Sequence, residues 1–161
     1  MSQTSKYISK DDALKLLQKY CAYQDRCHQE VRTKLLSYKI YGDDLEDIIT
    51  QLIQEKFLDE LRYTKSFVRG KTNIKKWGPN KIRQMLNQKQ ISDYCQRKAF
   101  EELDEHIHVE NLKYWLKRKE KDYSKDDEYM RRQKLMKFLQ AKGFDYADIK
   151  DQLNQFFKKT S

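Results

Sequence analysis

Apolar residues recur every three or four positions along almost the whole chain, and this spacing limits what it can fold into. Leu14, Leu17 and Cys21 are one example of an apolar stripe on one face of a helix. No segment shows the strict alternation of apolar and polar residues that a half-buried strand needs. The 161 residues include one Pro and four Gly, the two residue types that most disfavour helix interiors. The sequence therefore predicts an all-α protein.

Capping residues and breakers divide this pattern into about nine helices. The side-chain oxygen of Ser or Asp can accept a hydrogen bond from a free backbone N–H in the first turn of a helix. In four places an acidic residue follows the capping residue three positions later: Asp12 after Ser9, Glu46 after Asp43, Asp127 after Ser124 and Asp148 after Asp145. We expect helices to begin near Ser9, Cys27, Asp43, Asp59, Gly78, Ser92, ahead of Leu112, and near Ser124 and Asp145.

Similar helix ends recur and indicate an internal repeat. Residues 35–39, 85–89 and 138–142 each read as two apolar residues, two others and a Lys. Two positions after each Lys stands an apolar residue, namely Tyr41, Ile91 and Phe144. The pattern predicts three tandem three-helix repeats, each burying its apolar face against a neighbour. The alternative is a single irregular bundle. The expected divisions are a flexible N-terminus at 1–8 and repeats at 9–57, 58–104 and 105–158.

Positive charge is concentrated in the middle of the chain. Residues 61–100 contain eleven Lys or Arg and one acid, Asp93, so their formal charge is +10, whereas the whole chain carries +9. The other 121 residues therefore have a net charge of −1. A solvated helical face normally mixes both signs of charge. We therefore expect this segment to bind a polyanion or an acidic protein surface.

Trp77 and Arg83 each allow two interpretations. Trp77 could offer a ring for a base or a partner side chain to stack on, or it could be core, which we favour because Trp usually buries its area. Arg83 flanks an apolar stripe and could either cover the core with its stem or contact a partner. Arg62 is expected to form a structural ion pair. The candidate binding residues are Arg69, Lys71, Lys75, Lys76, Trp77, Lys81 and Arg83.

Motifs for catalysis, nucleotides or metals are weak. Residues 70–72 copy the end of a phosphate-binding loop, but Lys65 stands where the first glycine of that loop is needed. His106 and His108 lack the further Cys or His ligands that a zinc site requires. No serine or cysteine nucleophile can be paired with a base. We expect no enzymatic activity, no metal and no cofactor.

Cysteine use and hydropathy favour a cytoplasmic protein. The three cysteines, Cys21, Cys27 and Cys95, are odd in number and form no C-x-x-C pair. The start of the chain is polar, so no signal peptide is expected. Apolar runs are only two or three residues long, which predicts no transmembrane helix.

Four segments of the chain resemble the RecX family of bacterial recombination regulators. Residues 26–35 resemble the family's first conserved helix, and residues 57–64 resemble its L-D-D-x-R-F-A signature. Residues 78–86 resemble its G-P-x-R-I-R-Q-E-L segment, and residues 142–144 match a recurring K-G-F at a helix end. The chain departs from the family pattern at Cys27, Leu61, Tyr63, Thr64 and Met85.

The resemblance implies a regulator without catalytic activity. RecX proteins bind the RecA recombinase filament on single-stranded DNA, lie in its helical groove, and suppress its ATPase, filament extension and strand exchange. The family fold implied is an elongated, curved strip of three three-helix repeats. A monomer is the expectation for such a strip, with no membrane partner.

The basic middle repeat leaves the identity of its partner open. In a RecA regulator it would face the acidic filament surface, the bound single- or double-stranded DNA, or both. In a stand-alone DNA-binding helical module the same residues would neutralise phosphates without a recombinase. A third possibility is an adaptor for another acidic protein.

Overall fold

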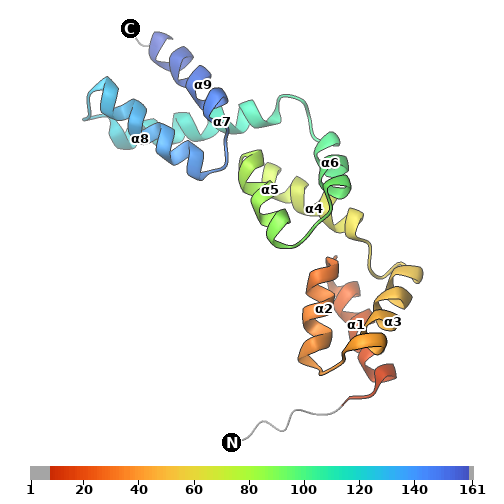
Figure 1. Cartoon of the computed structure of the whole chain (residues 1–161). Helices are drawn as coiled ribbons and strands as arrows, with labels where there is room; N and C mark the ends of the chain where they lie inside the picture. The colour runs from red at the N-terminus through yellow and green to blue at the C-terminus, as the bar shows by residue number, and fades with distance from the viewer. Residues whose placement is uncertain (1–7, 160–161) are drawn as a thin grey trace, which may run out of the picture. The chain divides into compact units, whose positions relative to one another are not determined.

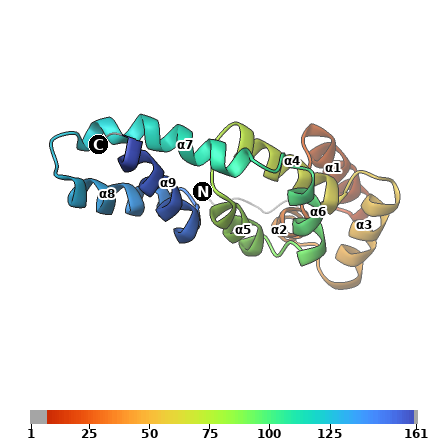
Figure 2. The same ribbon diagram turned by 90° about the horizontal axis from the view of Figure 1, so that it is seen from above.

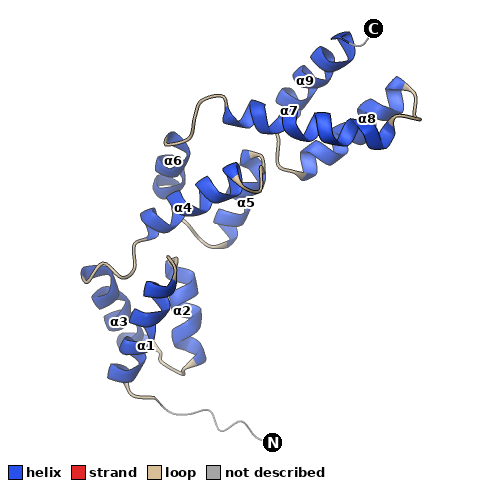
Figure 3. Ribbon diagram, turned by 180° about the vertical axis from the view of Figure 1, so that it is seen from behind, coloured by secondary structure: helices blue, strands red, loops and turns tan. Residues whose placement is uncertain are grey.

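The computed structural model describes residues 8–159. In this range the chain forms nine α-helices and one short 3₁₀ turn, with no strand (Figures 1 and 3). The predicted all-α class is therefore confirmed. No helix in this range is both long and apolar enough to cross a membrane. The α-helices are α1 (Lys10–Tyr23), α2 (His28–Ser37), α3 (Gly42–Gln54), α4 (Glu60–Asn73), α5 (Pro79–Gln88), α6 (Asp93–Glu101), α7 (Ile107–Lys119), α8 (Glu128–Ala141) and α9 (Tyr146–Lys159), with the 3₁₀ turn η1 (Glu120–Tyr123) between α7 and α8.

The chain forms two compact units, each described by itself. The first unit comprises residues up to 66 together with 88–99, and the second comprises 67–87 together with 100 onward. Helices α4 and α6 begin in the first unit and end in the second. The predicted repeat boundaries at 9–57, 58–104 and 105–158, and the curved strip, stay predictions. The N-terminal segment expected to be flexible lies, apart from Ile8, outside the described residues.

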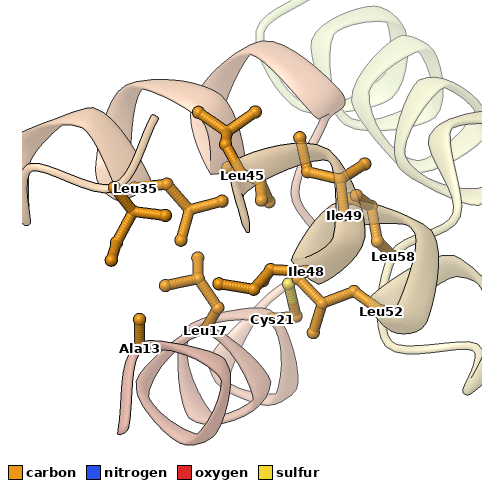
Figure 4. Close-up of a cluster of buried hydrophobic side chains, with 11 residues drawn as sticks. Ala13, Leu17, Cys21, Leu35, Leu45, Ile48, Ile49, Leu52 and Leu58 are labelled. Atoms are coloured by element: carbon orange, nitrogen blue, oxygen red, sulfur yellow. The ribbon is translucent and has the colours of Figure 1, made fainter. Parts of the chain in front are cut away.

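The first unit is built around a core contributed mainly by α1, α2 and α3 (Figure 4). Leu17, Leu35 and Leu52 are fully buried there, as their place on the predicted stripes requires. Burying a leucine side chain contributes about 1.5–3 kcal/mol, so these contacts dominate the stability of this unit. The spacing of Leu45, Ile48, Ile49, Leu52 and Ile53 predicts that all five face inward, but Ile53 is 43% exposed. It lies next to Leu52 at the edge of the stripe, on the solvent side.

The second unit has its own core where α7, α8 and α9 pack together (Figure 2). Leu112, Leu116, Leu135 and Leu139 are all buried in it, again as the helical spacing predicts. Phe144 and Ile149 extend this core from the α8–α9 turn into α9. Trp115 and Phe138 only border it, so their rings remain partly accessible.

Three of the predicted helix starts are confirmed by cap hydrogen bonds. Ser9 Oγ accepts from the backbone N–H of Asp12, Asp59 Oδ1 accepts from that of Arg62, and Ser92 Oγ accepts from that of Cys95. At α8 the cap is Asp127, whose Oδ1 accepts from Met130, and not the predicted Ser124. The 3₁₀ turn before α8 ends next to Ser124, which places it ahead of the helix.

The predicted start at Asp43 is wrong. Helix α3 begins one residue earlier, at Gly42, after Tyr41, which makes no side-chain cap. Glu46, expected to complete a capping box, instead receives two hydrogen bonds from the Arg32 guanidinium, at 2.6 and 3.1 Å. A charge-assisted bidentate pair competes successfully for that carboxylate.

The recurring helix ends share one backbone feature, a residue in the left-handed conformation. Lys39, Gln90 and Gly143 have φ angles of 60°, 58° and 101°. The next residue in each case is buried and apolar: Ile40, Ile91 and Phe144. At the first of these helix ends the buried site belongs to Ile40, and Tyr41, the apolar residue that the repeat pattern counts, is 60% exposed. The left-handed residue there is a lysine, where glycine is usual.

Helix α2 begins at a residue that cannot cap it. Cys27 precedes the helix and makes no side-chain cap, and its Sγ instead donates to Glu30 Oε1 at 3.3 Å. The free N–H of His28 donates to Glu60 Oε1 at 3.1 Å, so α4 supplies the missing cap. Nearby, Arg62 Nε pairs with Asp25 Oδ1 at 2.8 Å, which confirms the predicted structural ion pair.

Buried thiols generate a prediction about pH. The cysteines are all buried, and burial raises the pKa of Cys27 to about 11 and also raises the pKa of Cys21. The unfolded thiol titrates near pH 8.5, so the neutral thiols stabilise the fold fully below that pH. This contribution is lost as pH rises through about 11.

At pH 8 we expect iodoacetamide to label three thiols only after unfolding in guanidinium, as counted by mass spectrometry. Native labelling at the rate of free cysteine would contradict this burial.

Candidate functional site

The seven candidate binding residues all fall within the second unit. They lie on the last part of α4, on the α4–α5 turn and on α5. Arg69, Lys75 and Arg83 are exposed, and the other four are half-buried. The four half-buried residues are Lys71, Lys76, Trp77 and Lys81.

Helix α7 fixes the α4–α5 turn through two side-chain donors. The Asn111 side chain, which is 1% exposed, donates from Nδ2 to the carbonyl of Thr72 at 2.8 Å. Trp115 Nε1 donates to the carbonyl of Lys76 at 2.7 Å. The last carbonyls of a helix have no partner within the helix, so these two bonds satisfy groups that would otherwise need water. The basic turn is therefore held in one conformation.

The Gly-Pro and Lys-Gly-Phe motifs meet at a crossing of two backbones. The N–H of Gly78 donates to the carbonyl of Lys142 at 2.8 Å, and the N–H of Asn80 donates to that of Gly143 at 2.9 Å. A Cβ on Gly78 would overlap the backbone of Gly143, and a Cβ on Gly143 would overlap Lys81. Glycine is required at both positions of the crossing because the two backbones touch there.

Lysine ammonium groups lie over aromatic rings on both sides of this crossing. The Nζ atoms of Lys71 and Lys81 are 4.8 and 4.2 Å from the Trp77 ring centroid. Lys142 Nζ is 4.2 Å from that of Trp115. We call the following residues the lysine–aromatic cluster: Lys71, Lys76, Lys81, Lys119 and Lys142, with Trp77, Tyr114, Trp115 and Phe138.

Two members of this cluster extend it beyond the predicted segment. Lys119 Nζ lies 4.9 Å and Lys142 Nζ 5.5 Å from the Phe138 ring centroid. Sequence reasoning missed both lysines, because they follow Phe100 in a part of the chain whose overall charge is balanced. The one available signal was the Lys-Gly-Phe motif, which contains Lys142 but does not reveal that it meets Gly78.

The cluster carries positive charge with little compensation. In the part of the chain that the structure describes, Lys71, Lys76, Lys81 and Lys142 have no carboxylate within ion-pair distance, whereas Lys119 pairs with Asp122 at 2.9 Å. Burial lowers the pKa of Lys142, and the charges of Lys81 and Lys119 lower it further. These ammonium groups are thus close enough to repel one another, and an anion between them would relieve that repulsion.

Trp77 and Arg83 both reach the surface, and their expected contacts with a partner stay predictions. Trp77 is half-buried, and two lysine ammonium groups lie over its ring. The Arg83 guanidinium is exposed and lies 4.5 Å from the Phe100 ring centroid. Both side chains are anchored by packing and still reach the surface. Among residues 8–159, no three His, Cys, Asp or Glu side chains gather as metal ligands would.

The backbone crossing generates a prediction about stability. Gly78→Ala should lower the free energy of unfolding by about 1–3 kcal/mol, because the new Cβ meets backbone atoms that cannot move aside. The matched control is Gly70→Ala in α4, where a Cβ has open space. That change should raise stability by about 0.5–1 kcal/mol, since alanine is the better helix former. Urea unfolding followed by circular dichroism measures both, and equal stability of the two variants would contradict the crossing.

Family models and known proteins match most of the chain. Residues 59–99 match the model for the second three-helix domain of RecX, and residues 107–153 match the model for the third. The crystal structure of RecX from Lactobacillus salivarius superposes with a TM-score of 0.83 at 28% identity, covering 92% of this chain and 96% of that one. The predicted all-α fold of three-helix repeats is confirmed by these matches.

Curated relatives agree with this assignment. Regulatory protein RecX of Prosthecochloris aestuarii is 28% identical over 151 residues, 92% of this chain and 97% of the relative. That of Bacillus mycoides is 26% identical over 125 residues, and the match spans only 46% of the relative's length. That of Clostridioides difficile is 30% identical over 149 residues, 90% of this chain and 70% of the relative. The chain therefore belongs to the RecX family of regulatory proteins.

Proposed function

We propose that this chain is a regulator that binds the RecA recombinase filament on single-stranded DNA and inhibits its ATPase, filament extension and strand exchange. Membership of the RecX family supports this function. The observation that carries it is the lysine–aromatic cluster, whose ammonium groups lie around the crossing of two family-like motifs. In the described range, all of them except that of Lys119 lie beyond ion-pair distance of a carboxylate. The protein acts in the cytoplasm, as a monomer, and without catalysing a reaction.

Inhibition follows from occupancy of the filament. A nucleoprotein filament is strongly anionic, so a rigidly held group of lysines is attracted to it over about a Debye length. Once bound, a chain that bridges neighbouring protomers opposes the conformational cycle that accompanies ATP hydrolysis. It also occupies the space that a second DNA strand or an added protomer needs.

The direct test is the single-stranded-DNA-dependent ATPase of RecA. Added chain should lower the hydrolysis rate at amounts well below one per RecA protomer, because one bound molecule affects several protomers. The filament length seen by electron microscopy should fall in parallel. An unchanged ATPase rate together with unchanged filament length would contradict the proposal.

Charge reversal on the cluster and its turn should abolish this inhibition. Lys75, Lys76 and Lys81 changed together to Glu replace three positive charges by three negative ones, and the ATPase rate should return to that of RecA alone. The matched control is Lys15, Lys19 and Lys150, exposed lysines elsewhere, also changed to Glu. This control has the same net charge and should inhibit normally. Far-ultraviolet circular dichroism should show unchanged helix content in both. Normal inhibition by the first variant would mean that the basic segment is only a solvated face.

A stand-alone DNA-binding module is the second candidate function. The absence of carboxylates beside Lys71, Lys76, Lys81 and Lys142 within the described range favours it, because phosphates would then be the natural partners. Such a module binds bare duplex DNA tightly. The logarithm of its affinity falls linearly with the logarithm of the salt concentration, with a slope of roughly 0.9 per phosphate contact. It leaves the RecA ATPase unchanged when DNA is in excess.

A further inference from the structure

We propose that Lys119 and Lys142 join Lys71, Lys76 and Lys81 in one site that binds the backbone phosphates of nucleic acid and makes no contact with the bases. The inference rests on the proposed function in taking these lysines as a contact surface. It adds two residues outside the basic segment, the chemical class of the ligand, and the part of the nucleic acid that is contacted.

The backbone crossing places the lysines of α5 and α8 together. Gly143 lies against Lys81, since a Cβ added to Gly143 would stand 2.7 Å from the Lys81 backbone nitrogen. Lys142, the residue before Gly143, accepts the hydrogen bond from Gly78. The side chains of Lys81 and Lys142 therefore start from neighbouring points of two touching backbones. The two lysines are therefore neighbours in space although they are far apart in the sequence.

Aromatic rings hold the ammonium groups in place. Lys142 lies over Trp115, Lys81 over Trp77, and Lys76 Nζ is 5.1 Å from the Tyr114 ring centroid. Trp115 is itself fixed by its hydrogen bond to the Lys76 carbonyl and by edge contacts with Tyr114 and Phe138. A lysine that is already ordered loses less freedom when an anion binds, so the site is preorganised.

The same contacts argue against stacking of bases. A base stacks on an aromatic side chain only if the face of the ring is free. Two ammonium groups lie over Trp77, and one lies over Trp115. A stacking base would have to displace these lysines and lose the phosphate contacts they make. Binding should therefore be indifferent to the bases.

Phosphate fits the cluster better than the carboxylates of a protein partner. The five cluster lysines are compact point charges that bind phosphate. Arg118, whose Cζ lies 6.0 Å from the Tyr114 ring centroid, adds a guanidinium that suits phosphate as well as carboxylate. Lysine is also depleted at protein–protein interfaces. Burial lowers the pKa of Lys142 most, and the nearby charges of Lys81 and Lys119 lower it further, so a phosphate among these three lysines would offset both effects.

The two tryptophans of the chain, Trp77 and Trp115, both belong to the cluster, so intrinsic fluorescence reports on the site. The test titrates the full chain with a labelled thymidine oligonucleotide and with an abasic strand of equal length, following fluorescence and anisotropy. We expect a fluorescence change and dissociation constants within about twofold of each other, because only phosphates are contacted. Abasic binding weaker by about tenfold or more would overturn the inference, as would an equal response to polyglutamate at the same ionic strength.

Single neutral substitutions test the two added lysines. Lys119→Gln and Lys142→Gln should each reduce the slope of log affinity against log salt by about 0.7, the value for one phosphate contact on a single strand. Lys142→Arg, which keeps the charge, and Lys150→Gln, on an exposed face of α9, should leave the slope unchanged. Wild-type slopes in both Gln variants would overturn the inference. Circular dichroism of each variant shows whether a smaller salt slope is caused by unfolding. If Lys142→Arg keeps the wild-type slope, the effect of Lys142→Gln comes from the lost charge and not from altered packing.

The RecA ATPase assay run on the same samples separates this inference from the proposed function. If the chain inhibits RecA but does not bind the oligonucleotides, the phosphate site is wrong and the regulatory function stands. If it binds them as expected and leaves the ATPase unchanged, the regulatory function is wrong and the phosphate site stands.

Discussion

The contact between Gly78 and Gly143 is the constraint on which the second unit depends. Two hydrogen bonds join the backbones there, and neither position has room for a Cβ. The contact fixes the start of α5 against the α8–α9 turn, while Asn111 and Trp115 fix the end of α4 against α7. Residues far apart in sequence thereby become one surface. Without this approach of the backbones, Lys81 and Lys142 would belong to separate helices with no shared role.

Electrostatics sets this surface apart from the rest of the described chain. A fold gains nothing from gathering ammonium groups that repel one another, and among the five lysines of the cluster only Lys119 pairs with a described carboxylate, Asp122. Aromatic rings offset part of the repulsion and hold the lysines in fixed positions. Under the proposed function, an anionic partner would offset the rest. The stability of the unit and the proposed affinity for a polyanion would then be linked through the same side chains.

The core and the helix order could be predicted from sequence because both depend on local rules. Leu17, Leu35 and Leu139 occupy the buried stripes that helical spacing assigns, and Ser9, Asp59 and Ser92 cap as their residue type suggests. The failures arose where a distant residue competes. Arg32 takes the carboxylate expected to complete the capping box of α3. Lys119 and Lys142 were missed because charge counting along the chain cannot detect a crossing of backbones.

The central claim is that the lysine–aromatic cluster is the surface that engages the RecA nucleoprotein filament. The most direct measurement is the affinity of the fluorescently labelled chain for RecA filaments held on single-stranded DNA by a nonhydrolysable ATP analogue. The comparison is between wild type and a variant with Lys71, Lys76, Lys81, Lys119 and Lys142 all changed to Gln. We predict an affinity loss of at least about tenfold near 50 mM salt that shrinks as salt screens the charges. Equal affinity of a folded variant at low salt would contradict the claim.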